Sequence, residues 1–146
     1  MHSQLAESAL RSEGVVGNLR FHHLGVACRD LDAEEAGFAM LGYVREGPEF
    51  ADPTQGICGR FLIGPGPRLE LLRNLGEPGV LSDWIRKGVR FYHLAYETDA
   101  LEDSAAALVA AGAKQVAAAV PAVAFAGRRI AFYMLRNLTL VELIGP

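Results

Sequence analysis

Two histidines and two glutamates hold matching positions in two halves of the chain. His93 follows His23 by 70 positions, and the segments around them, FHHLGVA and FYHLAYE, are similar. Glu142 follows Glu70 by 72 positions, and each lies in a short apolar run. Imidazole nitrogens and carboxylate oxygens together bind zinc, cobalt, nickel, manganese or iron as divalent ions. If an approximate two-fold axis relates the halves, these side chains converge, and the sequence predicts a divalent metal site with all four as ligands.

Each of these residues, taken alone, has a simpler interpretation. A single histidine in a strand is more often a hydrogen-bonded structural residue, and a glutamate among leucines is more often the exposed member of a half-buried strand. However, both pairs keep their register in halves that otherwise differ. A carboxylate that faced inward would also be costly unless it were paired or bound to a cation. The coincidence therefore favours a shared metal site.

A neighbouring histidine, His22, competes with His23 for the role of ligand. In the repeat His22 aligns with Tyr92, whereas His23 aligns with His93. Because neighbouring residues of a strand point to opposite faces, only one of the two histidines is expected to face the site. The repeat assigns the ligand to His23.

The elements that must position these residues repeat with the same period. In each copy an aromatic and aliphatic strand precedes an acidic, alanine-rich helix, and further strands follow. The first copy is expected to have strands at 21–28, 43–46, 58–63 and 68–72 and a helix at 30–40. The second is expected to have strands at 91–98, 115–119, 129–135 and 138–144 and a helix at 99–111, closed by Gly112. The fold class predicted is α+β.

A short segment divides the two copies. Leu81, Trp84 and Ile85 recur at helical spacing, which predicts a short helix. The expected organisation is an N-terminal arm and one domain of two parts joined by this helical linker. These are the arm at 1–18, the parts at 19–75 and 89–146, and the linker at 76–88.

Composition narrows the classes of protein that fit. The chain has 146 residues, enough for one domain with a sizeable core. Its net charge of −3 lacks the basic footprint of a nucleic-acid binder. No apolar run is long enough to span a bilayer, and the first 18 residues do not resemble a secretory signal. With only 2 cysteines and no CxxC pair, a cytoplasmic protein without nucleic acid or membrane as partner is expected.

These residues together resemble the vicinal oxygen chelate superfamily, also called the glyoxalase/bleomycin-resistance/dioxygenase superfamily. The resemblance rests on HLGVA from 23, LELL from 69, HLA from 93 and VEL from 141, and it covers 19–145. It implies paired βαβββ modules that form a cupped mixed β-sheet, with the metal in the cup, and a homodimer. The order His, Glu, His, Glu is similar to that of the glyoxalase I and methylmalonyl-CoA epimerase families.

One segment departs from the epimerase pattern. The resemblance implies a catalytic glutamate in a Pro-Glu-His-Gly segment, and Thr54 stands in its place. A threonine hydroxyl does not act as a base near neutral pH, so Thr54 is expected to contact the substrate instead. Glu49 or Asp52 of the same loop are alternative acids or bases. Further substrate contacts are expected at Arg129, for an anionic group, and at Phe132.

The function predicted is a divalent-metal-dependent isomerase, epimerase or lyase. A metal with open positions would chelate two neighbouring oxygens of a small substrate and stabilise its enolate. Glu142, with Glu70 as its counterpart, would move the proton. The alternative is a non-catalytic antibiotic-binding protein of the bleomycin-resistance type, and a transferase or oxygenase of the superfamily is a third interpretation. In the binding protein, aromatic side chains would line the cup, namely Phe50, Phe61, Phe125, Phe132 and Tyr133.

Overall fold

The computed structural model describes residues 14–146. Most of the predicted arm, residues 1–13, lies outside the described residues. The first part of the chain forms β1 (Arg20–Ala27), α2 (Leu31–Ala39), β2 (Val44–Asp52), β3 (Ile57–Ile63) and β4 (Leu69–Asn74). After the short helix α3 (Ser82–Arg86), the second part repeats this order with one added turn of 3-10 helix, η1 (Val123–Phe125). Its elements are β5 (Phe91–Glu97), α4 (Leu101–Ala110), β6 (Lys114–Pro121), β7 (Arg129–Met134) and β8 (Leu140–Ile144).

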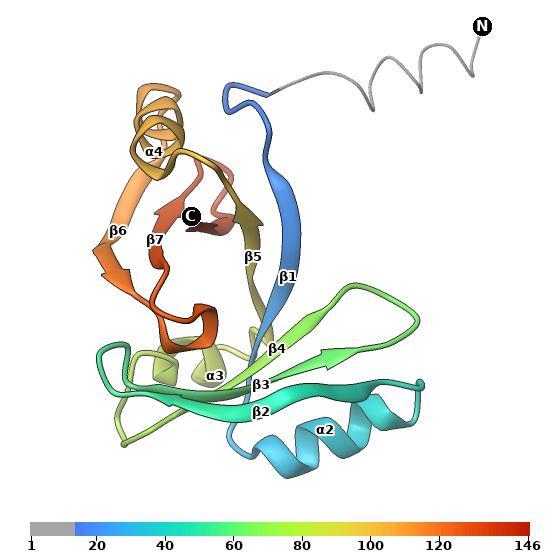
Figure 1. Ribbon diagram of the computed structural model, residues 1–146. Helices are drawn as coiled ribbons and strands as arrows, with labels where there is room; N and C mark the ends of the chain where they lie inside the picture. The colour runs from blue at the N-terminus through green and yellow to red at the C-terminus, as the bar shows by residue number, and fades with distance from the viewer. Residues whose placement is uncertain (1–13) are drawn as a thin grey trace, which may run out of the picture.

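All eight strands belong to one mixed sheet, in the order β2-β3-β4-β1-β5-β8-β7-β6. The first strand of each part pairs in parallel with the last strand of the same part, and the two parts join through the antiparallel pair β1 and β5. The sheet curls, so that β2, β3 and β4 run across the direction of β6 and β7 (Figure 1). This confirms the predicted α+β class and the paired βαβββ modules in a cupped mixed sheet.

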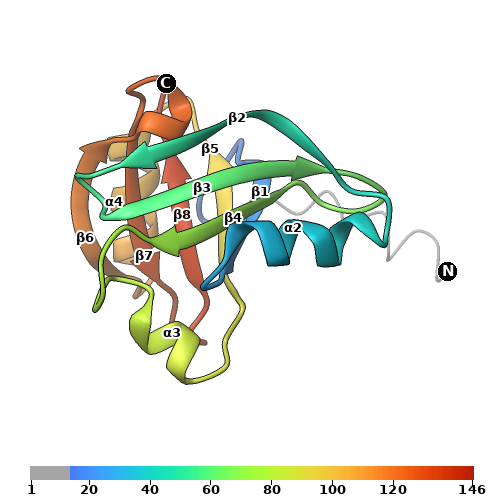
Figure 2. The ribbon, with the colours of Figure 1, turned by 90° about the horizontal axis from the view of Figure 1, so that it is seen from below.

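The long helix of each module, α2 or α4, covers the outer face of that module. Helix α2 lies along β3 and β4, and α4 lies against β6 and β8 (Figure 2). Leu71 of β4 is buried in the cluster that contains Leu31 of α2, and Leu143 of β8 is buried in the cluster that contains Leu101 of α4. Each of these leucines contributes about 1.5–3 kcal/mol to folding by leaving water. Since side chains alternate along a strand, the residue before each leucine must face the cup.

The ends of the helices show the same repeat. Gly42 and Gly112 follow α2 and α4 with φ angles of +99° and +103°, a conformation that other residues adopt only with strain. At the start of α2, the Asp30 carboxylate accepts hydrogen bonds from the backbone N–H groups of Asp32 and Ala33. The glycine signal thus ends both helices, whereas the side-chain cap is found at the start of α2 and not of α4.

Two elements differ most from the sequence prediction. Strand β2 continues to Asp52 instead of ending at Glu46, although Gly47 and Pro48 interrupt it. Since β2 is an edge strand with an irregular register between Glu46 and Phe50, the missing N–H of Pro48 costs no ladder bond there. The linker helix is also shorter than expected.

Within residues 14–146, no helix has the length and apolar character needed to cross a membrane.

Candidate metal centre

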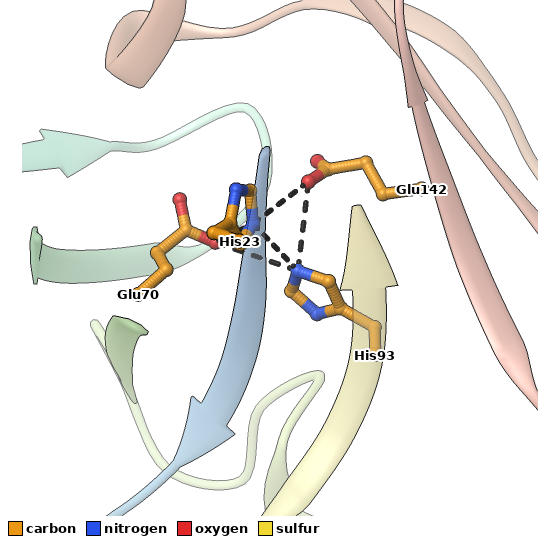
Figure 3. A group of neighbouring side chains, drawn as sticks. All are labelled: His23, Glu70, His93 and Glu142. Carbon is orange, nitrogen blue, oxygen red and sulfur yellow. Dashed lines mark hydrogen bonds and ion pairs between the residues drawn. The ribbon is translucent and has the colours of Figure 1, made fainter. Parts of the chain in front are cut away.

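The four predicted ligands meet at the centre of the sheet, where the two modules join. His23 lies on β1, Glu70 on β4, His93 on β5 and Glu142 on β8. Their side chains point toward one another inside the cup (Figure 3). One ligand atom from each residue lies within 4.8 Å of all the others.

The distances in this cluster suit a single divalent ion. The Nε2 atoms of His23 and His93 are 3.0 Å apart. The His23 Nε2 atom lies 3.2 Å from Oε1 of Glu70 and 3.2 Å from Oε1 of Glu142. The His93 Nε2 atom lies 3.6 Å and 3.5 Å from the same two oxygens. Ligands bound at about 2.1 Å and separated by right or tetrahedral angles are about 3.0–3.4 Å apart, so the donor set fits one ion.

The burial of the cluster also favours a cation. All four side chains are buried, and Oε1 of Glu142 makes no well-directed hydrogen bond among the described residues, although the Nε2 atoms of His23 and His93 lie 3.2 Å and 3.5 Å away. A buried carboxylate oxygen without a well-directed hydrogen bond is costly, and a bound cation would remove that cost. The Nε2 atoms of His23 and His93 point toward each other, and an ion bound by both would explain this orientation.

Without a metal, the cluster holds a proton at neutral pH. Burial opposes the charged form of His23, but the Glu70 and Glu142 carboxylates outweigh it and raise the pKa of His23 to about 9. Burial also opposes ionisation of Glu142, but His23 and His93 outweigh it and lower the pKa of that carboxyl to about 2. A divalent ion must therefore displace the proton of His23 when it binds.

His22 lies beside the cluster, against the expectation that only one of the two histidines faces the site. The pairing of β1 with β5 shifts register between Phe21 and His23, which turns the His22 side chain toward its neighbour. Its Nδ1 atom lies 2.8 Å from Nδ1 of His23. Burial, His23 and Arg68 lower the pKa of His22 to about 4, so the ring is neutral at neutral pH. It can accept the Nδ1–H bond of a His23 ring whose Nε2 holds a metal.

We expect His22→Ala to weaken metal binding by about 10–100-fold, because the orientation and tautomer of His23 lose their support. A competition titration with a chromophoric chelator measures the affinity, and the visible spectrum of the Co²⁺ form reports a change in ligand field. Arg20→Ala, which removes an exposed ion pair with Asp99 from the same strand, is the control. Equal affinity and an unchanged Co²⁺ spectrum in His22→Ala would show that His22 has no such role.

A cavity of about 160 Å³ opens beside the two carboxylates. Glu70 and Glu142 form part of its wall, and most of the remaining wall is aromatic or aliphatic. Trp84 of α3 and Tyr92 of β5 contribute one side. The metal site predicted from the sequence thus adjoins a space that a small molecule can enter.

Comparison with known proteins agrees with this architecture. Residues 22–132 match the model of the Glyoxalase/Bleomycin resistance protein/Dioxygenase superfamily. The chain belongs to this superfamily. Its relatives include the ethylmalonyl-CoA/methylmalonyl-CoA epimerase of Cereibacter sphaeroides, which is 26% identical over 128 residues and is matched over 85% of this chain and 96% of the relative.

Solved structures of other superfamily members have the same fold. Methylmalonyl-CoA epimerase from Mycobacterium tuberculosis superimposes with a TM-score of 0.74 at 27% identity, covering 92% of this chain and 91% of the epimerase. A variant of the Streptomyces coelicolor enzyme, in complex with 2-nitronate-propionyl-CoA, gives a TM-score of 0.71 at 26% identity, covering 86% of this chain and 96% of the other. Membership in the superfamily and these relatives support a function of the isomerase or epimerase type.

The three residues predicted to contact the substrate differ in their position relative to the cavity. Phe132 lines the cavity and meets the His93 ring edge to face, with ring centroids 5.4 Å apart. Thr54 is exposed in the turn between β2 and β3 and lies outside the cavity wall, which its neighbour Gln55 forms instead. Arg129 is exposed and pairs with Glu102 on the surface. Of the three, the structure brings only Phe132 to the cavity.

The alternative bases of the loop also point elsewhere. Glu49 pairs with Arg60, with Oε1 2.8 Å from Nε, and does not line the cavity. Asp52 is buried and accepts hydrogen bonds from the backbone and side-chain amides of Gln55 and from the N–H of Val123. Asp52 therefore ties the β2–β3 turn to the second module. Glu70 and Glu142 are the carboxylates that line the cavity.

Proposed function

We propose that the protein is a divalent-metal-dependent epimerase or isomerase that moves a proton at a carbon next to a carbonyl group. The observation that carries the proposal is the buried His23, Glu70, His93 and Glu142 cluster, whose two carboxylates also form the wall of the cavity. The epimerase relatives act on ethylmalonyl-CoA and methylmalonyl-CoA, and a related acyl thioester is the first substrate to test.

The four side chains have distinct parts in this proposal. His23 and His93 would hold the ion through Nε2, and Glu70 and Glu142 through carboxylate oxygens. When bound, a divalent ion supplies a Lewis acid for two neighbouring oxygens of the substrate. The carboxylates of Glu70 and Glu142 lie on opposite sides of His23 (Figure 3), and both residues line the cavity, so one can accept the proton and the other can return it.

The surroundings suit proton transfer at a weakly acidic carbon. The cluster is buried, and water is largely excluded by aromatic side chains such as Phe125, which stacks on His23 with ring centroids 5.9 Å apart. In such an environment, charged groups act more strongly on a reacting carbon than they do in water. Thr54, which lies outside the cavity, has no part in the transfer.

The test is exchange of the substrate's α-proton in D₂O, followed by NMR, with ethylmalonyl-CoA and methylmalonyl-CoA. Metal-loaded protein is expected to catalyse exchange, and Glu142→Gln is expected to lower the rate by about 10²–10⁴-fold because the proton carrier is lost. Glu102→Gln, at an exposed surface pair, is the matched control and should exchange at the wild-type rate. Metal-loaded protein that exchanges neither of these thioesters, nor a malonyl thioester with a larger hydrocarbon substituent, would contradict the epimerase proposal.

A second candidate is a binding protein of the bleomycin-resistance type, which would hold its ligand without turnover. The aromatic wall of the cavity favours it, since Phe50, Phe125 and Phe132 all contribute. Phe61 and Tyr133, the other aromatics expected in this lining, do not line the cavity. Ligand binding that is unchanged by metal removal would favour this candidate over the epimerase.

A further inference from the structure

The cavity beside the candidate metal centre is apolar and has no cation of its own. Of the described residues that line it, none is lysine, arginine or histidine. Leu72 and Met134 contribute aliphatic surface, and Val80 and Val116, both exposed, extend the apolar surface to the entrance. Apart from the two carboxylates of the cluster, the polar side chains in the wall are Gln55, whose amide N–H is already bonded to Asp52, and the uncharged Tyr92 and Trp84.

Three arginines in or beside strands β3 and β7 are engaged elsewhere. Arg60 pairs with Glu49 and Asp32 on the face of the sheet that α2 covers. Arg128 and Arg129 pair with Glu97 and Glu102. A second anionic group of a ligand, placed in this cavity away from the ion, would therefore be desolvated without a cationic partner, which is unfavourable.

The volume of the cavity sets the size of the group that fills it. Its 160 Å³ is close to the roughly 150 Å³ of an engineered apolar cavity that stays dry and binds benzene. A group of about six carbon atoms fits such a space, whereas a methyl group would leave most of it empty.

We propose that the substrate carries an uncharged branched or cyclic hydrocarbon group of about six carbons, which fills this cavity next to the oxygens held at the metal centre. The proposal rests on the proposed function for the position of those oxygens. It deepens that function by assigning the substituent: a hydrocarbon group larger than methyl or ethyl, and not a second acidic group.

The chain contains its own reporter for occupancy of the cavity. Trp84 is the single tryptophan of the protein and forms part of the wall, so its fluorescence responds to a bound group. Three 2-oxo acids share one oxygen pair and differ beyond it: pyruvate has a methyl group, 4-methyl-2-oxopentanoate an isobutyl group, and 2-oxoglutarate a carboxyethyl group close to isobutyl in size. Their relative affinities test the substituent with the oxygen pair held constant.

For metal-loaded protein, 4-methyl-2-oxopentanoate is expected to bind about 50-fold more tightly than pyruvate, because three more carbons leave water. The carboxylate of 2-oxoglutarate is expected to make that acid bind no better than pyruvate. Equal affinities for all three acids, or tightest binding of 2-oxoglutarate, would overturn the proposal.

Two neighbouring alanines of β6 supply a matched pair of variants. Ala117 lines the cavity, whereas Ala118, the next residue of the strand, does not. Ala117→Leu is expected to remove at least about tenfold of the preference for 4-methyl-2-oxopentanoate, since added carbons occupy the space. Ala118→Leu should retain the preference. An undiminished preference in Ala117→Leu would place the hydrocarbon group elsewhere and overturn the assignment.

Benzene separates this inference from the proposed function. It has no oxygen to offer a metal, so a change in Trp84 fluorescence on titrating metal-free protein with benzene reports the cavity alone. Binding of benzene without binding of any 2-oxo acid to metal-loaded protein would contradict the proposed function and support the assignment of the cavity. Failure of benzene to bind, with equal affinities of the three acids, would overturn the assignment and leave chelation at the metal centre standing.

Discussion

The wild-type protein, purified without chelator, is expected to carry about one divalent ion per chain, and His23→Ala/His93→Ala is expected to carry none. The two imidazoles supply both nitrogen ligands of the cluster, and their Nε2 atoms are only 3.0 Å apart. With both removed, Glu70 and Glu142 alone cannot hold an ion of this class tightly against water. Elemental analysis of both proteins measures the difference directly.

The same change should remove the dependence of thermal stability on metal. An ion that binds only the folded state, at a free concentration 1,000 times its dissociation constant, stabilises that state by about 4 kcal/mol. For a chain of this size, about 4 kcal/mol corresponds to a rise in Tm of about 10 °C. Scanning calorimetry should show this rise in the wild type and no rise in the double variant.

A second double variant guards against a failure to fold. The alanine substitutions leave two buried carboxylates without a cation, which is itself destabilising. His23→Gln/His93→Gln retains polar groups of similar size and is expected to fold, again without metal. Equal metal occupancy in the wild type and in a folded double variant would contradict the assignment of His23 and His93 as metal ligands.

The repeat explains why the sequence alone predicts that these four side chains meet. Equivalent residues of two fused modules lie close together where the modules join, and β1 pairs with β5 there. The apolar neighbours of Glu70 and Glu142 determine which way these residues face. Leu71 and Leu143 pack under the helices, so alternation turns each glutamate into the cup. Local pattern and duplication together therefore defined both the fold class and the cluster.

The positions of His22, Thr54 and Arg129 depend on details that alternation does not encode. A shift of register in β1, and not the regular strand, brings His22 beside His23. In the β2–β3 turn, hydrogen bonds to Asp52 fix Gln55 at the cavity wall and leave Thr54 exposed. The Arg129 guanidinium lies at the surface, where it donates a hydrogen bond to Glu102 of α4. These two residues are 27 positions apart in the sequence. Turn geometry and long-range ion pairs are not visible as sequence periodicity.

Gly25 is a further residue that the sequence alone did not single out. It pairs with His93 across β1 and β5. A Cβ atom at Gly25 would lie 2.1 Å from Cε1 and 2.2 Å from Nδ1 of the His93 ring, which is far inside van der Waals contact. At the matching position of the second module Ala95 faces His23, so one module retains a side chain where the other has none. The close approach of backbone and ring makes glycine necessary at position 25.

Gly25→Ala is therefore expected to displace the His93 ring by more than about 1 Å and to weaken metal binding by at least about a hundredfold, because a misplacement of that size disrupts a preorganised site. The overpacking should also lower the free energy of unfolding by about 1–3 kcal/mol. A competition titration measures the affinity, and urea unfolding measures the stability. Gly37→Ala is the control, since a Cβ atom there meets nothing within 4 Å and the helix α2 tolerates it.

A double-mutant cycle identifies the His93 ring as the cause. If the clash with this ring is the whole effect, Gly25→Ala should cost almost no stability in a His93→Ala background, because the ring that obstructs the new methyl group is gone. A coupling of about 1–3 kcal/mol between the two positions is expected. The same loss of stability from Gly25→Ala in both backgrounds would place its cause in the β1 backbone and not in the packing of His93 on Gly25.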